Sequence, residues 1–219
     1  MKEEILKRLS FYEHLTEKQK EELLTAARTE HFAEGDLIYT PARECLGMIY
    51  VKKGIIRTYL TAESGKKATI FRLREGEVCV LSMSCVMSAI TFDVEVEADK
   101  ECELFIIPAT VFSRVSQENI YVENFSYKIV TERFSSIVEA LQQMMFMSLE
   151  QRVISFLLDE SAALGTDTLM ITQEQLAENI GSAREAVTRV LKQLKDKELI
   201  VMGRGKIEIQ KRKELYQFI

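Results

Sequence analysis

The chain has 219 residues, of which 47% are hydrophobic and 29% are charged, so it can bury a sizeable core and is long enough for two domains. No apolar run approaches the roughly 18 residues that span a membrane, and the N-terminal MKEEILKRLS lacks the apolar core of a signal peptide. Four cysteines, two histidines and no Cys-x-x-Cys pair leave little material for a disulfide scaffold or a metal site. We therefore expect a cytoplasmic protein with reduced thiols, no metal and no membrane contact.

The formal charge of −5 at pH 7 is unevenly distributed. Residues 150–219 carry 11 basic and 11 acidic side chains, so the excess of acid lies in the N-terminal part. Within the neutral C-terminal part the basic side chains gather in two clusters, Arg184, Arg189, Lys192, Lys195 and Lys197, then Arg204, Lys206, Lys211, Arg212 and Lys213. A local basic face is sufficient for phosphate contact, while acidic surroundings limit non-specific binding.

The N-terminal half contains two kinds of secondary-structure pattern. Residues 3–29 have the apolar spacing of helices, with Thr16 as a helix cap. From His31 to Pro108, β-rich runs such as LIY, MIYV, ATIFRL and ELFII follow one another at about ten-residue spacing, with glycines between them. Residues 61–65 are suited to a hairpin turn between two of these runs. The pattern predicts an antiparallel sandwich or roll.

Helix returns from about Val111, and a long helix over about residues 118–147 carries a strict apolar repeat. Its members alternate steps of three and four residues, which is the a/d seam of a coiled coil: Tyr127, Val130, Phe134, Ile137, Leu141 and Met144. A helix packed on its own β-domain would also be apolar on one face. The strictness of the repeat and the aromatic bulk favour a homodimer, which would suit a palindromic DNA site with half-sites about 34 Å apart.

A second helix begins at Ser148, whose spacing to Gln151 is that of a capping box. A cap in the middle of a helical region indicates a joint, so we interpret Phe146–Ser148 as a hinge. This places a sensor domain with the dimerisation helix at residues 1–147 and a second domain at residues 148–219.

Residues 173–194, QEQLAENIGSAREAVTRVLKQL, have the spacing of a helix-turn-helix. Gly181 lies where a left-handed backbone would end the first helix, and Ser182 is expected to cap the second with Glu185 completing a capping box. The apolar contacts between the helices come from Leu176, Ala177, Ile180, Val187 and Val190. The second helix, Ala183–Lys195, would leave its charged side chains free to reach bases and phosphates in a major groove.

Two short strands around Gly203-Arg204-Gly205 follow, and the tail KRKELYQFI is expected to be a terminal helix. The two strands predict a wing whose Arg204 and Lys206 could touch DNA phosphates.

A β-roll, a long dimer helix and a winged helix-turn-helix, in that order, resemble the Crp/Fnr family of bacterial transcription regulators. The similarity covers essentially the whole chain and is most specific at residues 171–200, ITQEQLAENIGSAREAVTRVLKQLKDKELI; EGDLIY, IYVKKGIIRTYL and LREGEV look like the family's glycine-marked strands. The resemblance implies an α+β fold with an N-terminal cyclic-nucleotide-binding-like antiparallel β-roll. It also implies base-reading roles for Arg184, Glu185 and Arg189, and phosphate contacts for Thr172, Ser182, Thr188 and Lys192.

The chain departs from its relatives where they hold an effector. Residues 76–92 contain no basic side chain, and Ile137 and Val138 replace the family's hydroxyl residues on the dimer helix, so cyclic AMP is not expected. The first 44 residues contain no cysteine, which argues against the family's N-terminal iron–sulfur cluster. His14 and His31 are expected to lie on the surface rather than to bind haem. The cofactor therefore stays unknown.

The segment from Cys79 to Cys85 is the remaining candidate for the sensing site. Both thiols can be buried packing residues, since free cysteine behaves as a small hydrophobe. Alternatively they line a redox, metal or apolar-ligand pocket that faces the dimer helix near Phe134 and Ile137. Cys45 and Cys102 are isolated in the sequence and are interpreted as structural.

No phosphate loop, nucleophile elbow or metal-spaced His/Cys set points to an enzyme. We expect a homodimeric transcription regulator that binds double-stranded DNA and is gated by a small-molecule effector or a redox signal in the β-roll. RNA polymerase is a possible further partner. The alternative is a constitutive DNA-binding regulator whose β-roll serves only for dimerisation.

Overall fold

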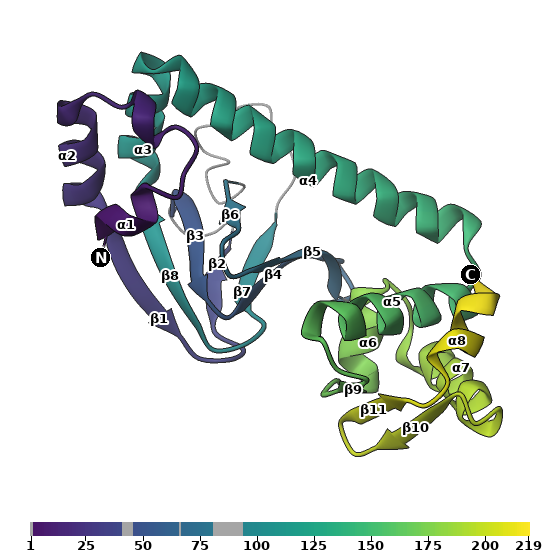
Figure 1. The fold of residues 1–219 in the computed structure, drawn as a ribbon. Helices are drawn as coiled ribbons and strands as arrows, with labels where there is room; N and C mark the ends of the chain where they lie inside the picture. Colours follow the sequence, from purple (N-terminus) through teal and green to yellow (C-terminus); the bar gives the residue numbers. More distant parts are fainter. Residues whose placement is uncertain (1, 41–45, 66, 81–93) are drawn as a thin grey trace. The chain divides into compact units, whose positions relative to one another are not determined.

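The computed structural model describes residues 2–40, 46–65, 67–80 and 94–219 (Figure 1). Contacts between residues divide the chain into two compact units. The first combines residues 1–61 with residues 70–137, and the second combines residues 62–69 with residues 138–219.

The first unit begins with short helices, α1 (Lys2–Leu6), η1 (Tyr12–His14) and α2 (Glu17–Ala26). The predicted cap at Thr16 is confirmed, because its hydroxyl accepts the Gln19 N–H at 3.3 Å and its own N–H donates to the Gln19 side chain at 3.1 Å. The expectation of helix as far as Thr29 is wrong. Ala27 is already extended, and residues Arg28–Phe32 form a strand because they pair with a later one.

In the described part of the first unit, eight strands form two antiparallel sheets, which confirms the predicted roll. The strands are β1 (Arg28–Phe32), β2 (Leu37–Tyr39), β3 (Met48–Lys53), β4 (Ile55–Thr61), β5 (Lys67–Arg74), β6 (Val78–Cys79), β7 (Glu95–Ala98) and β8 (Cys102–Ile107). One sheet has the order β1-β8-β3-β6 and the other has the order β2-β7-β4-β5. The predicted hairpin turn joins β4 to β5, and the Gly65 N–H donates to the Ala62 carbonyl at 2.8 Å.

The strands β3 and β8 are apolar at successive positions because both of their faces are covered. On β8, Leu104 and Ile106 pack between the two sheets, while Phe105 and Ile107 pack against the helices. Successive side chains of a strand point to opposite faces, so a strand between two cores loses the polar alternation of a surface strand.

The helices α3 (Ala109–Glu118) and α4 (Ile120–Phe146) follow β8. One face of α4 is buried on the first unit, through Val122 and Ile129. Most of the predicted seam lies outside this face: Phe134 is 65% exposed and Leu141 is 54% exposed, whereas Val130 is partly buried. The helix therefore carries two apolar stripes, one packed on its own domain and one exposed.

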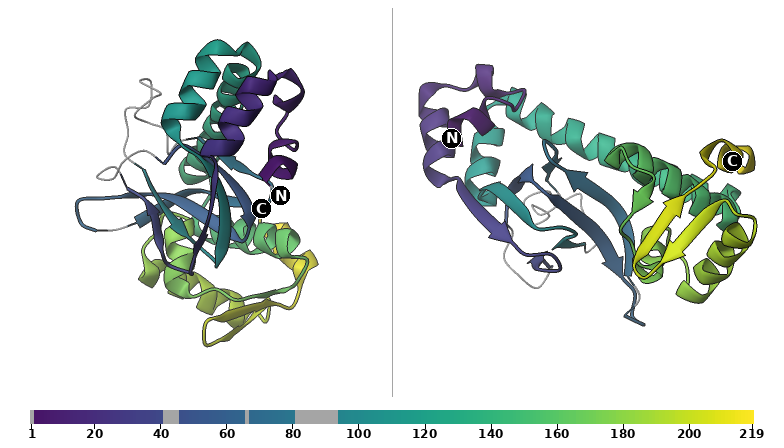
Figure 2. Two further views of the ribbon diagram at one scale, coloured as in Figure 1. Left: turned by 90° about the vertical axis from the view of Figure 1, so that its left-hand side faces the viewer. Right: turned by 60° about the horizontal axis from the view of Figure 1, so that its bottom comes forward.

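The second unit contains a winged helix-turn-helix, as predicted. Its elements are α5 (Leu149–Leu164), β9 (Thr168–Leu169), α6 (Gln173–Asn179), α7 (Arg184–Asp196), β10 (Ile200–Gly203), β11 (Lys206–Ile209), α8 (Arg212–Leu215) and η3 (Tyr216–Phe218). The strands form an antiparallel sheet of order β10-β11-β9. Figure 2 shows the β10–β11 hairpin, which is the wing, beside α5 to α7. The core includes the predicted helix-turn-helix contacts Leu176, Ala177, Ile180, Val187 and Val190.

The predicted capping box at Ser148 is confirmed. Its hydroxyl accepts the Gln151 N–H at 3.2 Å, and its N–H donates to the Gln151 side chain at 2.9 Å. The helix α4 ends at Phe146, immediately before this cap. The helix is therefore interrupted at Met147–Ser148, whereas contacts divide the chain earlier, after Ile137, and a hinge at Phe146–Ser148 stays a prediction.

The C-terminal helix α8 is held to the rest of the second unit by a cluster of Arg212, Asp167 and Ser161, which we call the clamp. The Arg212 Nε donates to Asp167 at 3.1 Å, and the Ser161 hydroxyl lies 3.1 Å from the same carboxylate. Beside the clamp, Leu215 is buried in the core. The hydrogen bond from Arg212 lowers the pKa of Asp167 below its ordinary value.

We predict that Asp167→Asn lowers the free energy of unfolding at neutral pH and makes it less sensitive to acid. Because the folded-state pKa lies below the unfolded value of about 3.9, the carboxylate contributes stability above that pH. The contribution is lost as the pH falls through the folded-state pKa. Denaturant melts between pH 7 and pH 2.5 measure the gap between the two proteins. The exposed Asp196→Asn is the control, and a gap that stays constant down to pH 2.5 contradicts the prediction.

Candidate nucleic-acid interface

The turn of the helix-turn-helix is built on Gly181. The helix α6 ends at Asn179 with Ile180 as its C-cap, and Gly181 then takes a φ of +63°. The Ser182 N–H donates back to the Ala177 carbonyl at 2.9 Å, which closes the helix in the manner of a Schellman motif. Left-handed backbone favours glycine, so the prediction for Gly181 is confirmed.

The predicted cap at Ser182 is wrong. The helix α7 begins at Arg184, its N-cap is Ala183, and no side chain caps it. The Ser182 amide is already used to close α6, and one more extended residue is needed before α7 can start. Consequently Glu185 is not part of a capping box, and the helix spans Arg184–Asp196 rather than Ala183–Lys195.

The predicted base-reading side chains lie on the exposed side of α7. Arg184, Glu185 and Arg189 are all exposed, as is the predicted phosphate contact Lys192. The opposite side is buried through Val187, Val190, Leu191 and Leu194. The helix is therefore held by one apolar stripe, which leaves its charged side chains free for a ligand.

The first turn of α6 aligns this charged face. The Thr188 hydroxyl donates to the Gln173 side chain at 2.6 Å, and Arg184 Nε lies 3.7 Å from a Glu174 carboxylate oxygen. Both members of that ion pair are 61% exposed, so it contributes only about 0–1 kcal/mol and can be exchanged for a DNA contact. The Thr172 hydroxyl caps α6 by accepting the Gln175 N–H at 3.1 Å, and its own proton stays available as a donor.

The wing places two more of the predicted DNA-contacting residues, Arg204 and Lys206, near the first turns of α6 and α7. A hollow of about 450 Å³ lies between the wing and the first turns of α6 and α7, and its lining includes Thr172, Gln173, Glu174, Arg184, Arg204 and Lys206. Arg204 is exposed at the tip of the wing, and Lys206 pairs with Glu208 at 2.9 Å. Three basic side chains, one from α7 and two from the wing, therefore line one surface hollow.

The structure gives less support to the cysteine candidates for the sensing site than to the candidate DNA-contacting residues. Cys79 is buried between the sheets of the roll, opposite Ile49, whereas Phe134 points to solvent, so these two do not share an environment. Cys102 is also buried, and burial raises its pKa to about 11, with a further contribution from Asp36 and Glu101. The thiol therefore stays protonated and weakly reactive at neutral pH. The other candidate, Cys85, and also Cys45, lie outside the described residues.

Arg133 is a candidate that the sequence analysis missed. It reaches from α4 to the β-roll, where its guanidinium contacts Glu77 at 3.1 Å and lies 5.4 Å from the ring centre of Phe71. Its side chain is only 14% exposed, and its Nε is buried without a hydrogen-bond partner among the described residues. The signal was present in the sequence, since steps of four and three residues link Val122, on the buried face, to Arg133.

Comparison with known proteins identifies the family. Residues 151–218 match the model of the Crp-like helix-turn-helix domain, and residues 29–119 match that of the cyclic nucleotide-binding domain. The chain is 35% identical to a Crp/Fnr-family protein of known structure from Eubacterium rectale, with a TM-score of 0.93 and coverage of 97% of this chain and 98% of that one. The chain belongs to the Crp/Fnr family. It is a DNA-binding transcription regulator with a cyclic-nucleotide-binding domain, which confirms the fold and the resemblance.

More distant relatives agree with this assignment. The global nitrogen regulator of Synechococcus elongatus is 26% identical over 188 residues, which cover 82% of this chain and 84% of that protein. The structure of FixK2 from Bradyrhizobium japonicum has a TM-score of 0.70 at 15% identity, with coverage of 88% and 96%, and it supports the fold alone. Crp/Fnr proteins are transcription regulators rather than enzymes.

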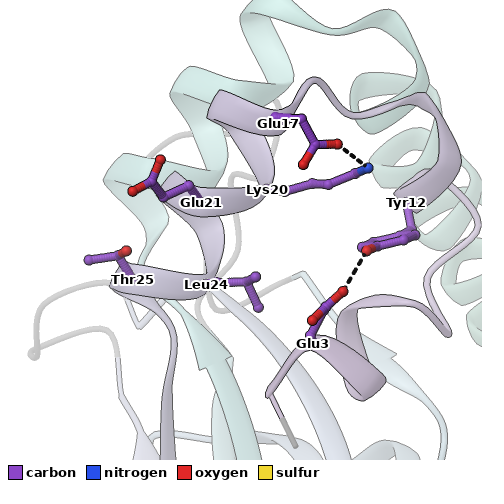
Figure 3. A pocket seen from close by; sticks show the side chains of 7 residues that line it. All are labelled: Glu3, Tyr12, Glu17, Lys20, Glu21, Leu24 and Thr25. Atoms are coloured by element: carbon purple, nitrogen blue, oxygen red, sulfur yellow. Dashed lines mark hydrogen bonds and ion pairs between the residues drawn. The ribbon is translucent and has the colours of Figure 1, made fainter.

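A further pocket, of about 460 Å³, lies between α1, η1 and α2 (Figure 3). Its polar groups bind one another: the Tyr12 hydroxyl donates to Glu3 at 3.0 Å, and Lys20 pairs with Glu17 at 2.8 Å (Figure 3). Lys20 also lies 4.9 Å from the centre of the Tyr12 ring. These contacts tie the three short helices together, and we assign the pocket a structural role.

The two histidines, the candidate metal-binding groups and the helices complete the description of the chain. His14 and His31 are exposed, as predicted. Among the described residues no three His, Cys, Asp or Glu side chains are grouped to hold a metal ion. The described helices include none long and apolar enough to cross a membrane.

Proposed function

We propose that this Crp/Fnr regulator acts as a homodimer, reads a palindromic DNA site with α7 and is gated by a small-molecule effector in its β-roll. One observation carries the DNA-reading part of the proposal. Arg184, Glu185 and Arg189 are exposed on one side of a helix whose other side is fixed in the core. The wing adds Arg204 and Lys206 beside them.

The exposed side chains have the chemistry for direct base readout. An arginine matches O6 and N7 of guanine, and a glutamate accepts from N4 of cytosine, so Arg184, Glu185 and Arg189 can distinguish G·C pairs in a major groove. The residues that we assign to phosphates position α7 without reading sequence: Thr172, Ser182, Thr188, Lys192, Arg204 and Lys206.

We predict that Arg184→Ala weakens binding of the preferred site about 10- to 100-fold, corresponding to the roughly 1–3 kcal/mol of one bidentate base contact, and relaxes the preference at one G·C pair. Competition binding against single-base variants of the site measures both effects. Lys192→Ala is the matched comparison. It removes a phosphate contact, so it is expected to weaken all sequences alike and to reduce the salt slope by about one. Unchanged affinity and preference in Arg184→Ala would end the assignment.

The exposed stripe of α4 supports the homodimer. Phe134 and Leu141 belong to the strict 3.5-residue repeat and are both more than half exposed. Contiguous apolar patches on a soluble protein indicate an interaction surface, and a seam of this period fits the same helix of a second copy. A two-fold dimer presents two α7 helices, which matches a palindrome with half-sites about 34 Å apart.

We predict that Phe134→Glu with Leu141→Glu yields a monomer that loses preference for a palindrome over a single half-site. Buried like charges across the seam are costly, because each carboxylate loses its hydration. Sedimentation equilibrium and binding to full and half sites measure the change. Ser135→Glu with Gln142→Glu adds the same charge to the same helix at exposed positions outside the seam and is the control. A double seam variant that stays dimeric contradicts the proposal.

The buried Arg133 supports gating by an effector with an acidic group. Its Nε lacks a hydrogen-bond partner among the described residues, although it lies against Glu77 and Phe71. A buried donor without an acceptor costs free energy that an incoming carboxylate or phosphate can recover. The redox alternative at Cys79 and Cys85 is less favoured, since Cys79 is buried in the core between the sheets.

We predict that an acidic effector raises the thermal stability of the wild type and changes its affinity for DNA, and that Arg133→Gln loses both responses. A ligand present at 100 times its Kd adds about 2.7 kcal/mol to the free energy of unfolding. Thermal shift with a panel of dicarboxylates, sugar phosphates and nucleotides, followed by DNA titration, measures the response. Arg133→Lys retains the charge and is the comparison. A wild type whose DNA affinity no compound alters favours the constitutive alternative, in which the roll only supports dimerisation.

A further inference from the structure

The backbone between α6 and α7 determines where the DNA-reading helix points. Only four residues, 180–183, join the two helices, and they turn through Gly181. A small change in the backbone of such a short link moves every side chain on the exposed side of α7. The groups that fix this turn therefore act on DNA recognition without touching DNA.

Arg152 contacts the turn from α5. Its Nη1 donates to the carbonyl of Ile180 at 2.9 Å. Ile180 is the C-cap of α6, where the unpaired carbonyls of a helix give its end a partial negative charge. The hydrogen bond is therefore charge-assisted, and it pins the last carbonyl before Gly181.

The position of Arg152 is costly for folding. Its Nε is buried without a hydrogen-bond partner, and no carboxylate pairs with the guanidinium among the described residues. Partial burial of a cation without an anion favours replacement by an apolar side chain of similar volume. A geometric role, rather than a gain in stability, then explains why a guanidinium stands here.

The surroundings of the turn do not fix it by themselves. Both polar atoms of the Asn179 amide are buried without partners among the described residues. On Gly181, a Cβ would collide with the terminal methyl of Met144, so flexible methionine rather than a rigid group covers the glycine. The Ile180 N–H bond to Leu176 and the bonds to the Ala183 carbonyl belong to the two helix ends. Across the turn itself, the Arg152 hydrogen bond and the Ser182 N–H bond to Ala177 are the directional contacts among the described residues.

We propose that Arg152 is a positioning residue for DNA reading: by holding the Ile180 carbonyl, it sets the angle of α7 and thereby raises the preference for the specific site over other DNA. This inference rests on the proposed DNA-reading role of α7. It assigns no DNA contact to Arg152 itself.

Three variants test the proposal. Arg152→Met replaces the guanidinium by an apolar chain, Arg152→Lys retains a cationic donor, and Lys18→Met removes an exposed charge on α2, outside both basic clusters, as the control. The measurements are affinity for specific and random DNA over a range of salt, thermal stability, and hydrogen exchange of the Ser182 amide.

We expect Arg152→Met to keep or raise the Tm, to exchange the Ser182 amide faster, and to lose about 10-fold in the ratio of specific to random affinity, since one charge-assisted hydrogen bond is lost. Its salt slope is expected to stay that of the wild type, because no phosphate contact is removed. Arg152→Lys is expected to restore most of the ratio. Lys18→Met is expected to leave the ratio unchanged.

Other outcomes overturn the proposal. Equal losses for specific and random DNA with a slope reduced by about one would make Arg152 a phosphate contact. An Arg152→Met protein that fails to fold, or whose Tm falls sharply while Arg152→Lys does not recover the ratio, would make the residue a stabilising one. If the wild type shows no preference for any DNA, the proposed function fails; the Ser182 exchange rate then still decides whether Arg152 holds the turn.

Discussion

The helix α4 carries two apolar stripes, and the rest of the structure depends on what covers each of them. The stripe through Val122 and Ile129 is buried on the β-roll, which fixes α4 to its own domain. The stripe through Phe134 and Leu141 is more than half exposed within the described part of the chain. Burying an apolar side chain contributes about 1.5–3 kcal/mol, so covering several such residues would favour the binding of a second copy. The same helix runs from the first unit into the second.

The charge is distributed unevenly over the molecule. The chain as a whole is acidic, yet α7 and the wing present Arg184, Arg189 and Arg204 to solvent. A basic face on an acidic protein attracts DNA locally and repels it elsewhere, which favours the orientation in which α7 faces the groove. The surface pair of Arg184 with Glu174 is weak enough not to compete with this contact.

Features that depend on local chemistry could be predicted from the sequence. Left-handed Gly181, the helix cap at Thr16 and the capping box at Ser148 need only a few neighbouring residues, and all three predictions are confirmed. The cap at Ser182 was wrong because a local hydroxyl pattern does not reveal that the Ser182 amide closes the preceding helix. The outcome depended on the backbone rather than on the side chain.

Features that depend on distant partners could not be predicted in the same way. The segment RTEHF lacks the alternation of a surface strand, and it becomes β1 because β8, more than seventy residues later, supplies its hydrogen-bonding partners. Arg133 was missed for the same reason, since its partner Glu77 lies 56 residues away. A search for a cation within residues 76–92 alone could not find one that α4 supplies from outside the segment.

Arg133 and Arg152 share an unusual physical condition. Each is a largely covered guanidinium on a helix, each has a buried Nε without a partner among the described residues, and they lie in different units. A buried donor without an acceptor raises the free energy of the conformation that contains it. A ligand or a second conformation that supplies an acceptor is therefore favoured, because it removes this cost. One lies where the roll meets α4, and the other holds the turn that aims α7. In the proposed homodimer, an effector that engages the first could alter DNA reading through a state that also differs at the second, so Arg152 is one place where the proposed gating and recognition can meet.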